Sequence, residues 1–375
     1  MASPRFKLSA YLSAAMLFAS CGHRESISSG KSAAESSRVC IQTFNAYGPA
    51  YSRNIPGRTK AVGEALKATP CEIIQFQEIW TEDHHNLEIT AVSHSISTLS
   101  ATRFDDTERP YIGKSGLSIF TSEVLTEQSF EQFTVNRDGI LDDIRESLGV
   151  IKGMGTSRVT FRDDDTKDLQ MINLHTHPDS VPVRITQVTQ LLKRFERMLP
   201  LAAPLVVTGD FNFEPQSVEY KLLRSFTVLT DSYESDHGGY HDGDCTYCAE
   251  NPLHWFGDSR VIDYILVRSS ATRRIEPDGT LINLRGNETI TPSDHYGLRS
   301  YVTLAGQEHP RVTPEVFEAR REAAIQAIDA TLTTLQDNDA ADGDYSATVT
   351  TLNSFRRRLT AAASDDPVLE QMSIP

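Results

Sequence analysis

Six short polar motifs, each at the end of an apolar run or inside one, constrain the fold of this chain more than any other feature. They are TFNAY (43–47), FQEIW (76–80), NLHTHP (173–178), VVTGDFNFEP (206–215), VIDYILV (261–267) and PSDHYGL (292–298). A short apolar run that stops at polar residues predicts a buried β-strand with functional side chains at its end. Packing demands alone do not account for six such strand ends, so we expect the motifs to meet at one site.

The intervening sequence predicts further strands and a few helices. Additional strand-like runs lie at residues 116–121, 149–161 and 301–304, and helices are predicted over 58–68 and 184–199. The second of these helices carries apolar residues at a spacing of 3.6. This pattern is typical of an α+β fold in which sheets pack on each other and are covered by helices.

The chain changes character after residue 305. Thr313 predicts a helix N-cap with Pro314 in the first turn, and an acidic break at 337–344 separates this helix from a second amphipathic stretch. We interpret residues 306–375 as a helical hairpin and tail appended to the preceding domain, 38–305, with a structural or docking role.

Residues 1–21 have the features of a signal peptide. A charged start precedes an apolar stretch, 8–18, that is too short to span a bilayer. LFASC, at 17–21, resembles a bacterial lipobox, and residues 22–37 resemble a flexible polar tether. We expect an exported protein, either an outer-membrane or periplasmic lipoprotein that associates with the membrane through lipidated Cys21, or a secreted protein. No obligate protein partner is expected.

The other four cysteines are consistent with an oxidising compartment. Cys40 and Cys71 begin neighbouring predicted strands, and we predict a disulfide between them. The second pair belongs to an H-x3-H-x3-C-x2-C pattern formed by His237, His241, Cys245 and Cys248. This spacing can hold zinc, but segment 231–251 is rich in Gly, Asp and Tyr and predicts a long surface loop. We therefore favour a bridge or a free pair at this position over a zinc site.

Oxygen ligands that suit a hard cation follow two of the strands and recur in the last motif. Asn45 and Glu78 end neighbouring predicted strands, and Asp294 belongs to the SDH motif. Mg²⁺ takes oxygen ligands and is usually held by one or two carboxylates together with a substrate phosphate. We expect these three residues to bind Mg²⁺, with Mn²⁺ as a substitute.

The remaining polar residues supply acid–base and phosphate-binding chemistry. His295 has an ordinary pKa near working pH, which suits a base. Asp263, an acid inside an apolar strand, needs a partner and would orient the His295 ring. Asp210 and Asn212 stand at i and i+2, so both can face one pocket; Asp210 would position the attacking water and Asn212 would donate to a phosphoryl oxygen.

His175 would donate to another phosphoryl oxygen. Weaker candidates for phosphate contact are Lys152, Arg158 and His177.

Over residues 38–305 the chain resembles the endonuclease/exonuclease/phosphatase superfamily, the deoxyribonuclease-I-like fold. The resemblance lies in its motifs, which occur in the order N, QE, H, GDxN, D and SDH. The resemblance implies a four-layer α/β/β/α sandwich of two mostly antiparallel mixed sheets, with a Mg²⁺-dependent site at one end of the sheets. It implies hydrolysis of a phosphate ester, with a phospholipid or a nucleic acid as the substrate. The residues named above match the family motifs position by position.

Three features favour a lipid substrate. CTYCAENP, at 245–252, is similar to a loop of neutral and bacterial sphingomyelinases, and the strand beginning at Lys152 resembles theirs. The formal net charge of −15 disfavours a tight nucleic-acid binder. We expect a sphingomyelinase-like phosphodiesterase. A secreted endonuclease or exonuclease is the alternative, and a catalytically inactive binding protein is the non-enzyme alternative.

Overall fold

The computed structural model describes residues 37–49, 52–96, 99–104, 115–135, 151–164, 167–255, 257–287, 289–306, 311–338, 344–361 and 366–375. The predicted signal peptide, Cys21 and all of the predicted tether except its last residue lie outside these ranges. Among the described helices, none is both long and apolar enough to cross a bilayer.

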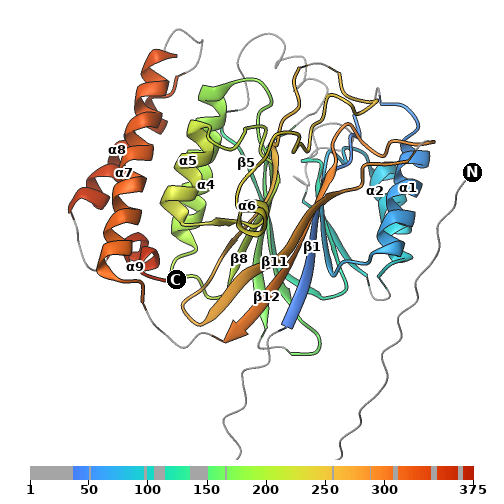
Figure 1. The fold of residues 1–375 in the computed structure, drawn as a ribbon, viewed down its shortest axis with the longest axis horizontal. Helices are drawn as coiled ribbons and strands as arrows, with labels where there is room; N and C mark the ends of the chain where they lie inside the picture. The colour runs from blue at the N-terminus through green and yellow to red at the C-terminus, as the bar shows by residue number, and fades with distance from the viewer. Residues whose placement is uncertain are drawn as a thin grey trace, which may run out of the picture. The chain divides into compact units, whose positions relative to one another are not determined.

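Two six-stranded sheets form the centre of the fold (Figure 1). In order across the first sheet, the strands are β11 (Arg273–Asn283), β12 (Gly297–Gly306), β1 (Ser37–Asn45), β2 (Ile73–Gln77), β4 (Leu117–Thr121) and β3 (Ser100–Phe104). In order across the second, they are β5 (Val124–Gln132), β6 (Gly153–Thr160), β7 (Asp168–His175), β8 (Leu205–Asp210), β10 (Asp263–Arg268) and β9 (Thr230–Asp231). Within the described residues, β1 pairs with β2 and β7 pairs with β8 in parallel, and the other neighbouring strands are antiparallel.

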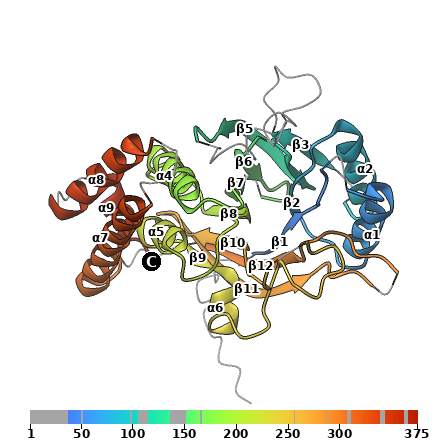
Figure 2. The same ribbon diagram turned by 90° about the horizontal axis from the view of Figure 1, so that it is seen from above.

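Helices cover the outer face of each sheet, which gives the predicted four layers (Figure 2). On the side of the first sheet lie α1 (Ile55–Ala68) and α2 (Glu82–Ser93), and on the side of the second lie α4 (Val181–Arg197) and α5 (Val218–Thr227). The short helix α6 (Ser232–His237) contacts β10 and β11. The predicted fold class is therefore confirmed.

The apolar strand residues fill three interfaces. Strand β8 illustrates the alternation, because Val206 packs between the two sheets whereas Leu205 and Val207 pack under the helices. Both faces of this strand are buried, and its sequence therefore reads as a continuous apolar run. Gly209 follows because β7 comes very close: a Cβ at this position would lie 2.0 Å from the carbonyl oxygen of Leu174.

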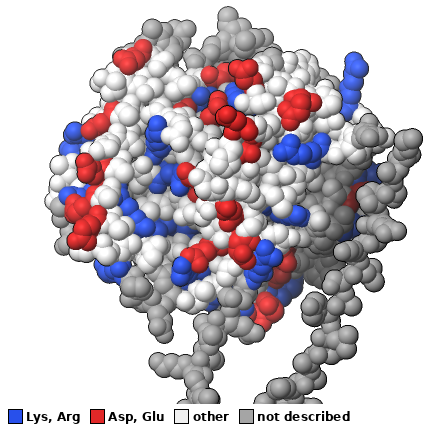
Figure 3. All heavy atoms as spheres, viewed as in Figure 1, with Lys and Arg blue, Asp and Glu red and all other residues white. Residues whose placement is uncertain are grey.

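The C-terminal region is helical, as the sequence predicts. It contains α7 (Pro314–Asp337), capped by the Thr313 side chain, α8 (Ser346–Ala361) and α9 (Pro367–Met372). Their apolar residues share one core cluster with α4 and α5, and Figure 2 shows them on the outer side of those helices. Lys, Arg, Asp and Glu side chains are interspersed over the face drawn in Figure 3.

Both cysteine pairs are bridged. The predicted Cys40–Cys71 disulfide is present and joins the first part of β1 to the segment before β2. Cys245 and Cys248 are also joined, as we favoured over zinc. The prediction of a surface loop over 231–251 is wrong in two places, because Ser232–His237 form α6 and because Cys245 and Cys248 are 2% and 0% exposed. Polar residues on either side of this pair masked the burial of a compact turn.

Candidate active site

The strand topology brings the polar strand ends to one edge of the sandwich. The carboxyl ends of the parallel strands β7 and β8 carry His175 and Asp210, which are register partners, and the antiparallel strand β10 starts opposite Asp210 with Asp263. In the other sheet, β1 ends at Asn45 and its parallel neighbour β2 ends directly before Glu78. Six chain segments far apart in sequence therefore deliver polar side chains to the same place.

Asp210 stands at the centre of this group. Its Oδ2 atom accepts a hydrogen bond of 3.0 Å from the Asn45 amide and lies 3.3 Å from His175 Nε2 and 3.7 Å from His295 Nε2. Burial alone would raise the pKa of Asp210, but the neighbouring histidines, together with Lys152, hold it well below its usual value. The carboxylate is therefore ionised at neutral pH and its contacts are charge-assisted.

His295 and Asp263 form a buried pair. The Nδ1 atom of His295 lies 2.8 Å from Asp263 Oδ2, while its Nε2 atom faces Asp210. Burial opposes the charged imidazolium, yet the carboxylates of Asp263, Asp210 and Asp294 outweigh it and raise the pKa of His295 to about 10. A carboxylate on Nδ1 fixes the ring orientation and leaves Nε2 for proton transfer.

His175 connects Asp210 with Glu78. Its Nε2 atom is 3.9 Å from Glu78 Oε1 and is also contacted by Lys152 Nζ. Burial and the charge of Lys152 lower the pKa of His175, although Asp210 opposes them. The imidazole is therefore neutral and close to two carboxylates and one ammonium group. Lys152, a weaker candidate from the sequence, lies inside the site.

The carboxylates suit a hard cation. Burial, followed by the charges of Glu78 and Asp210, raises the pKa of Asp294 to about 7, although His295 opposes the shift. A carboxyl group whose ionisation is resisted by neighbouring carboxylates is stabilised by a divalent cation. The donor set therefore fits the predicted Mg²⁺. The role of Glu78, Asp294 and Asn45 as ligands stays a prediction, and the Asn45 amide is shared between Asp210 and the backbone nitrogen of Tyr47.

Asp210, Asp263 and His295 could form a different metal site, because their ligand atoms lie within 4.8 Å of one another. Asp263 is fully buried and its Oδ2 atom is already hydrogen bonded to His295. An imidazole that shares its Nδ1 proton with a carboxylate cannot offer that nitrogen to a metal. Only Nε2 of His295 could then join Asp210 in holding a metal, and the role of these atoms in proton transfer stays a prediction.

Left-handed backbone conformations aim several of these side chains. Tyr47, Glu78 and Asn212 have φ angles of 47°, 62° and 51°, and each follows the end of a site strand. A non-glycine residue in this region is strained by about 1–3 kcal/mol, and such residues cluster at functional sites. The left-handed conformation at these positions turns the chain sharply away from each strand end at the site.

Arg58 supports the site, and sequence reasoning missed it. This buried side chain of α1 donates to the carbonyl oxygens of Ala46, Tyr47 and Pro292 at 3.0, 2.7 and 2.8 Å. It thereby joins the turn after Asn45 to the loop that carries Asp294. No local pattern marks Arg58, because its partners are carbonyl groups from other segments.

The other candidates have structural contacts. The Asn212 amide donates to the carbonyl oxygen of Thr176, so its phosphate-binding role stays a prediction. His177 Nδ1 accepts backbone hydrogen bonds from the residues before α4. Arg158 pairs with Asp168 and Glu127, which is an ordinary use of a surface cation.

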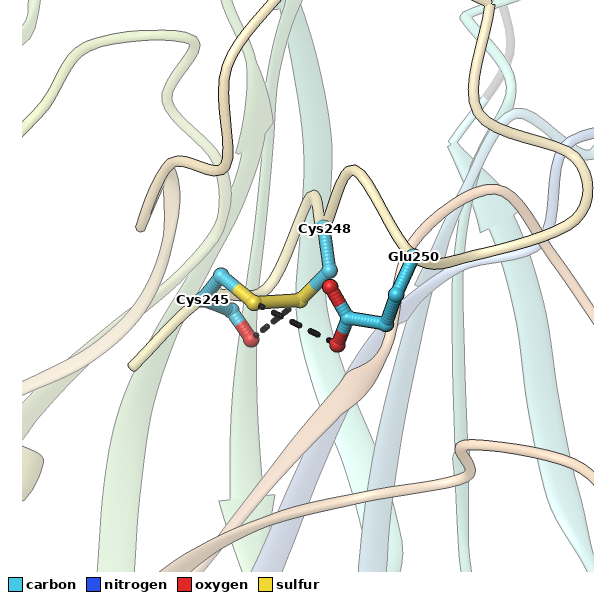
Figure 4. A group of neighbouring side chains, drawn as sticks. All are labelled: Cys245, Cys248 and Glu250. Carbon is cyan, nitrogen blue, oxygen red and sulfur yellow. Dashed lines mark hydrogen bonds between the residues drawn. A yellow bond between two sulfur atoms is a disulfide. The ribbon is translucent and has the colours of Figure 1, made fainter. Parts of the chain in front are cut away.

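The zinc pattern is not assembled. His237 Nε2 contacts the carbonyl oxygen of Thr280, and His241 Nε2 contacts that of His237. Figure 4 shows Cys245 and Cys248 joined, with Glu250 beside them. Disulfide sulfurs carry no thiolate to ligate a metal. The disulfide therefore excludes a zinc site in the oxidised protein.

The family model described as the endonuclease/exonuclease/phosphatase family matches residues 43–295. The chain belongs to this family. The matched residues include five of the six motifs in full and the sixth as far as His295, and so cover the site that the motifs form. Members of the endonuclease/exonuclease/phosphatase family are metal-dependent phosphoric ester hydrolases, and this chain is accordingly such an enzyme.

Two curated proteins that are similar to this chain in sequence carry the names of sphingolipid enzymes. A protein of Caenorhabditis elegans named "putative neutral sphingomyelinase" is 22% identical over 297 residues, which are 72% of this chain and 67% of the relative. The inositol phosphosphingolipids phospholipase C of Schizosaccharomyces pombe is 22% identical over 207 residues, which are 52% of this chain and 46% of the relative. The chain thus spans about two thirds of the first relative and about half of the second.

Solved structures share the fold. The beta toxin of Staphylococcus aureus, solved with bound magnesium ions, matches with a TM-score of 0.54 and 13% identity over 71% of this chain and 99% of its own. A mannosyl-6-phosphatase of Bacteroides thetaiotaomicron matches with a TM-score of 0.55 and 15% identity, again over 71% and 99%. At these identities the likeness establishes the fold of the catalytic region.

Proposed function

We propose that this enzyme is an exported Mg²⁺-dependent phosphodiesterase that hydrolyses a sphingolipid-type phosphodiester through a water activated by His295. The observation that carries the proposal is the position of Asp210 within 3.7 Å of both His175 and His295. Water, phosphate and cation can be contacted together only where these groups converge. The names of both curated relatives support the sphingolipid class, and two disulfides support export.

His295 would act as the general base. Its Nδ1 atom is occupied by Asp263, so Nε2 would take the proton from the attacking water, once a bound cation has offset the carboxylates that raise the pKa of His295 to about 10. Asp210, 3.7 Å from that nitrogen, would orient the water and stabilise the imidazolium that forms. Both carboxylates are buried, so neither needs to reorganise during the reaction.

The phosphoryl oxygens would be bound by His175 and Lys152, with Asn212 as a further donor. Lys152 contacts His175, so an ammonium group and an imidazole are placed side by side facing the acidic cluster. When bound by Glu78 and Asp294, the cation would polarise the phosphoryl group and offset the carboxylate charge around His295. Most of the rate enhancement would come from positioning and electrostatic stabilisation.

A paired assay tests this proposal. Purified protein is incubated with sphingomyelin vesicles, with the chromogenic diester bis(4-nitrophenyl) phosphate and with plasmid DNA, each with Mg²⁺ and with a chelator. We expect Mg²⁺-dependent hydrolysis of the vesicles and the chromogenic diester. Cleavage of plasmid DNA without cleavage of vesicles would replace the lipid assignment by a nuclease.

The assigned base is tested by His295→Ala, with His94→Ala as the control outside the site. His295→Ala should lower kcat by about 10²- to 10⁴-fold, and the control should retain activity. A His295→Ala variant that retains activity within a few-fold of the unchanged protein would show that another group takes the proton.

A further inference from the structure

A turn outside the motif residues lies against the proposed base. This cystine turn, residues 245–248, is closed by the Cys245–Cys248 disulfide (Figure 4). Its central residue Thr246 is 0% exposed, and both cysteines are at most 2% exposed. The turn packs between the start of β10, which carries Asp263, and the residues before β12, which carry His295. Its position between the two members of the buried pair suggests a function beyond holding a loop.

Thr246 contacts the backbone of both partners. Its Oγ1 atom accepts hydrogen bonds from the backbone nitrogens of Ile262 and Asp263 at 3.1 and 3.2 Å. Its carbonyl oxygen accepts one of 2.6 Å from the backbone nitrogen of Tyr296, the residue after His295. One threonine therefore sets the distance between the chain segments that carry the acid and the imidazole.

The residues around Thr246 reinforce this connection. The backbone nitrogen of Tyr247 donates to the carbonyl oxygen of Arg260, and its ring lies 5.1 Å from the His295 ring, measured between centroids. After the turn, the Asn251 amide donates to the carbonyl oxygen of Ser293, in the SDH motif, at 2.9 Å. The turn and Asn251, three residues beyond it, thus contact the chain on both sides of His295.

The disulfide is placed for local rigidity rather than for global stability. It joins residues only three positions apart, whereas Cys40 and Cys71 are 31 positions apart. A bridge over so short a loop restricts the unfolded chain less than the longer bridge does. It does restrict the backbone on both sides of Thr246, and so keeps the Oγ1 atom and the carbonyl oxygen in place.

We propose that the cystine turn positions the Asp263–His295 pair, with Thr246 as the positioning residue and the disulfide as its support. The inference rests on the proposed role of His295 as the base. Loosening the turn would change the angle between the imidazole and the attacking water, and small displacements of this kind lower the rate of the chemical step. Substrate binding uses other residues and should change little.

Four variants test the inference on the chromogenic diester with Mg²⁺. Thr246→Val removes the Oγ1 acceptor at nearly constant volume and should lower kcat by about 10- to 100-fold with KM within about 3-fold. Thr246→Ser keeps the acceptor and should restore most of the lost kcat. Cys245→Ala/Cys248→Ala should resemble Thr246→Val. The matched control Thr331→Val removes another fully buried hydroxyl, in α7, and should leave kcat unchanged.

The Cys40→Ala/Cys71→Ala variant is the control for loss of a disulfide and should retain kcat within about 3-fold. The inference is overturned if Thr246→Val and Cys245→Ala/Cys248→Ala both keep kcat within 3-fold of the unchanged protein, or if Thr246→Ser is as impaired as Thr246→Val. Circular dichroism of each variant identifies any that fails to fold, and the remaining variant of the pair then decides. Failure of the proposed function itself is seen separately, as full activity in His295→Ala.

Discussion

The two disulfides close loops of very different length, so their removal should change stability unequally. Cys40 and Cys71 are separated by 31 positions, and Cys245 and Cys248 by three. A disulfide stabilises a fold chiefly by restricting the unfolded chain, and the restriction grows with the logarithm of loop length. We predict that Cys40→Ala/Cys71→Ala lowers the free energy of unfolding more than Cys245→Ala/Cys248→Ala.

The chain-entropy relation gives the size of each change. For separations of 31 and three it yields about 3.7 kcal/mol for the long loop and about 1.6 kcal/mol for the short one at 25 °C. All four cysteines are at most 2% exposed, so the loss of buried sulfur is similar in both variants. The two variants should therefore differ by about 2 kcal/mol in their free energy of unfolding.

Urea denaturation followed by circular dichroism measures both values against the unchanged protein. Catalytic activity of the same variants should rank in the opposite order, because only the short-loop bridge adjoins Asp263 and His295. Equal destabilisation of the two variants, or a larger loss for the short loop, would refute the chain-entropy reasoning. The cystine turn would then have to be regarded as a stabilising element of the fold in its own right.

Three further predictions concern the site and its supports. Asp263→Asn should lower kcat by about 10³-fold with little change in KM, because an amide favours the wrong tautomer of His295; steady-state kinetics measure this. Arg58→Met should lower the free energy of unfolding by about 3–5 kcal/mol, since several buried carbonyl groups lose their donor. The control Arg356→Met, at an exposed ion pair, should leave the urea midpoint nearly unchanged. A chelator should abolish hydrolysis and Mg²⁺ should restore it, and Glu78→Gln should raise the Mg²⁺ concentration needed for half-maximal activity.

The strands that end at the site were predictable because their signal is local. Residues 205–207 are apolar on both faces, since β8 is covered by a sheet on one side and by helices on the other. The polar residues that follow mark the point where the strand leaves the core. Helix α4 was equally clear, because its apolar side faces the sheet while its other side is polar.

Helix α2 and strand β11 were not predicted, and each has a physical reason. In α2 the buried face is partly polar: His84 and Glu88 are 2% and 1% exposed, and His84 Nε2 lies 3.3 Å from Glu88 Oε1, so no apolar period marks the helix. In β11 a bulge between Pro277 and Thr280 interrupts the alternation. Local patterns fail where burial is satisfied by polar partners or by an irregular strand.

The supports of the site were unpredictable for a related reason. Arg58 acts through the carbonyl group of Pro292, 234 positions away, and Thr246 acts through the backbone of Asp263 and Tyr296. Residue type identifies a side chain that can take part in chemistry, because few types can do so. It does not identify a side chain that holds the backbone of another segment, because almost any polar residue can.

A layer of buried amides between the sheets explains how residues from both sheets hold one geometry. Gln77 Nε2 donates to Asn173 Oδ1 at 2.7 Å, and the Asn173 amide donates to the carbonyl oxygens of Phe76 and Ser118 at 2.9 and 3.0 Å. Gln77 immediately precedes Glu78, and Asn173 lies two residues before His175 on the same face of β7. Sliding one sheet over the other would leave these fully buried groups without partners. The 3.9 Å separation of His175 from Glu78 is therefore fixed from inside the sandwich rather than by surface loops.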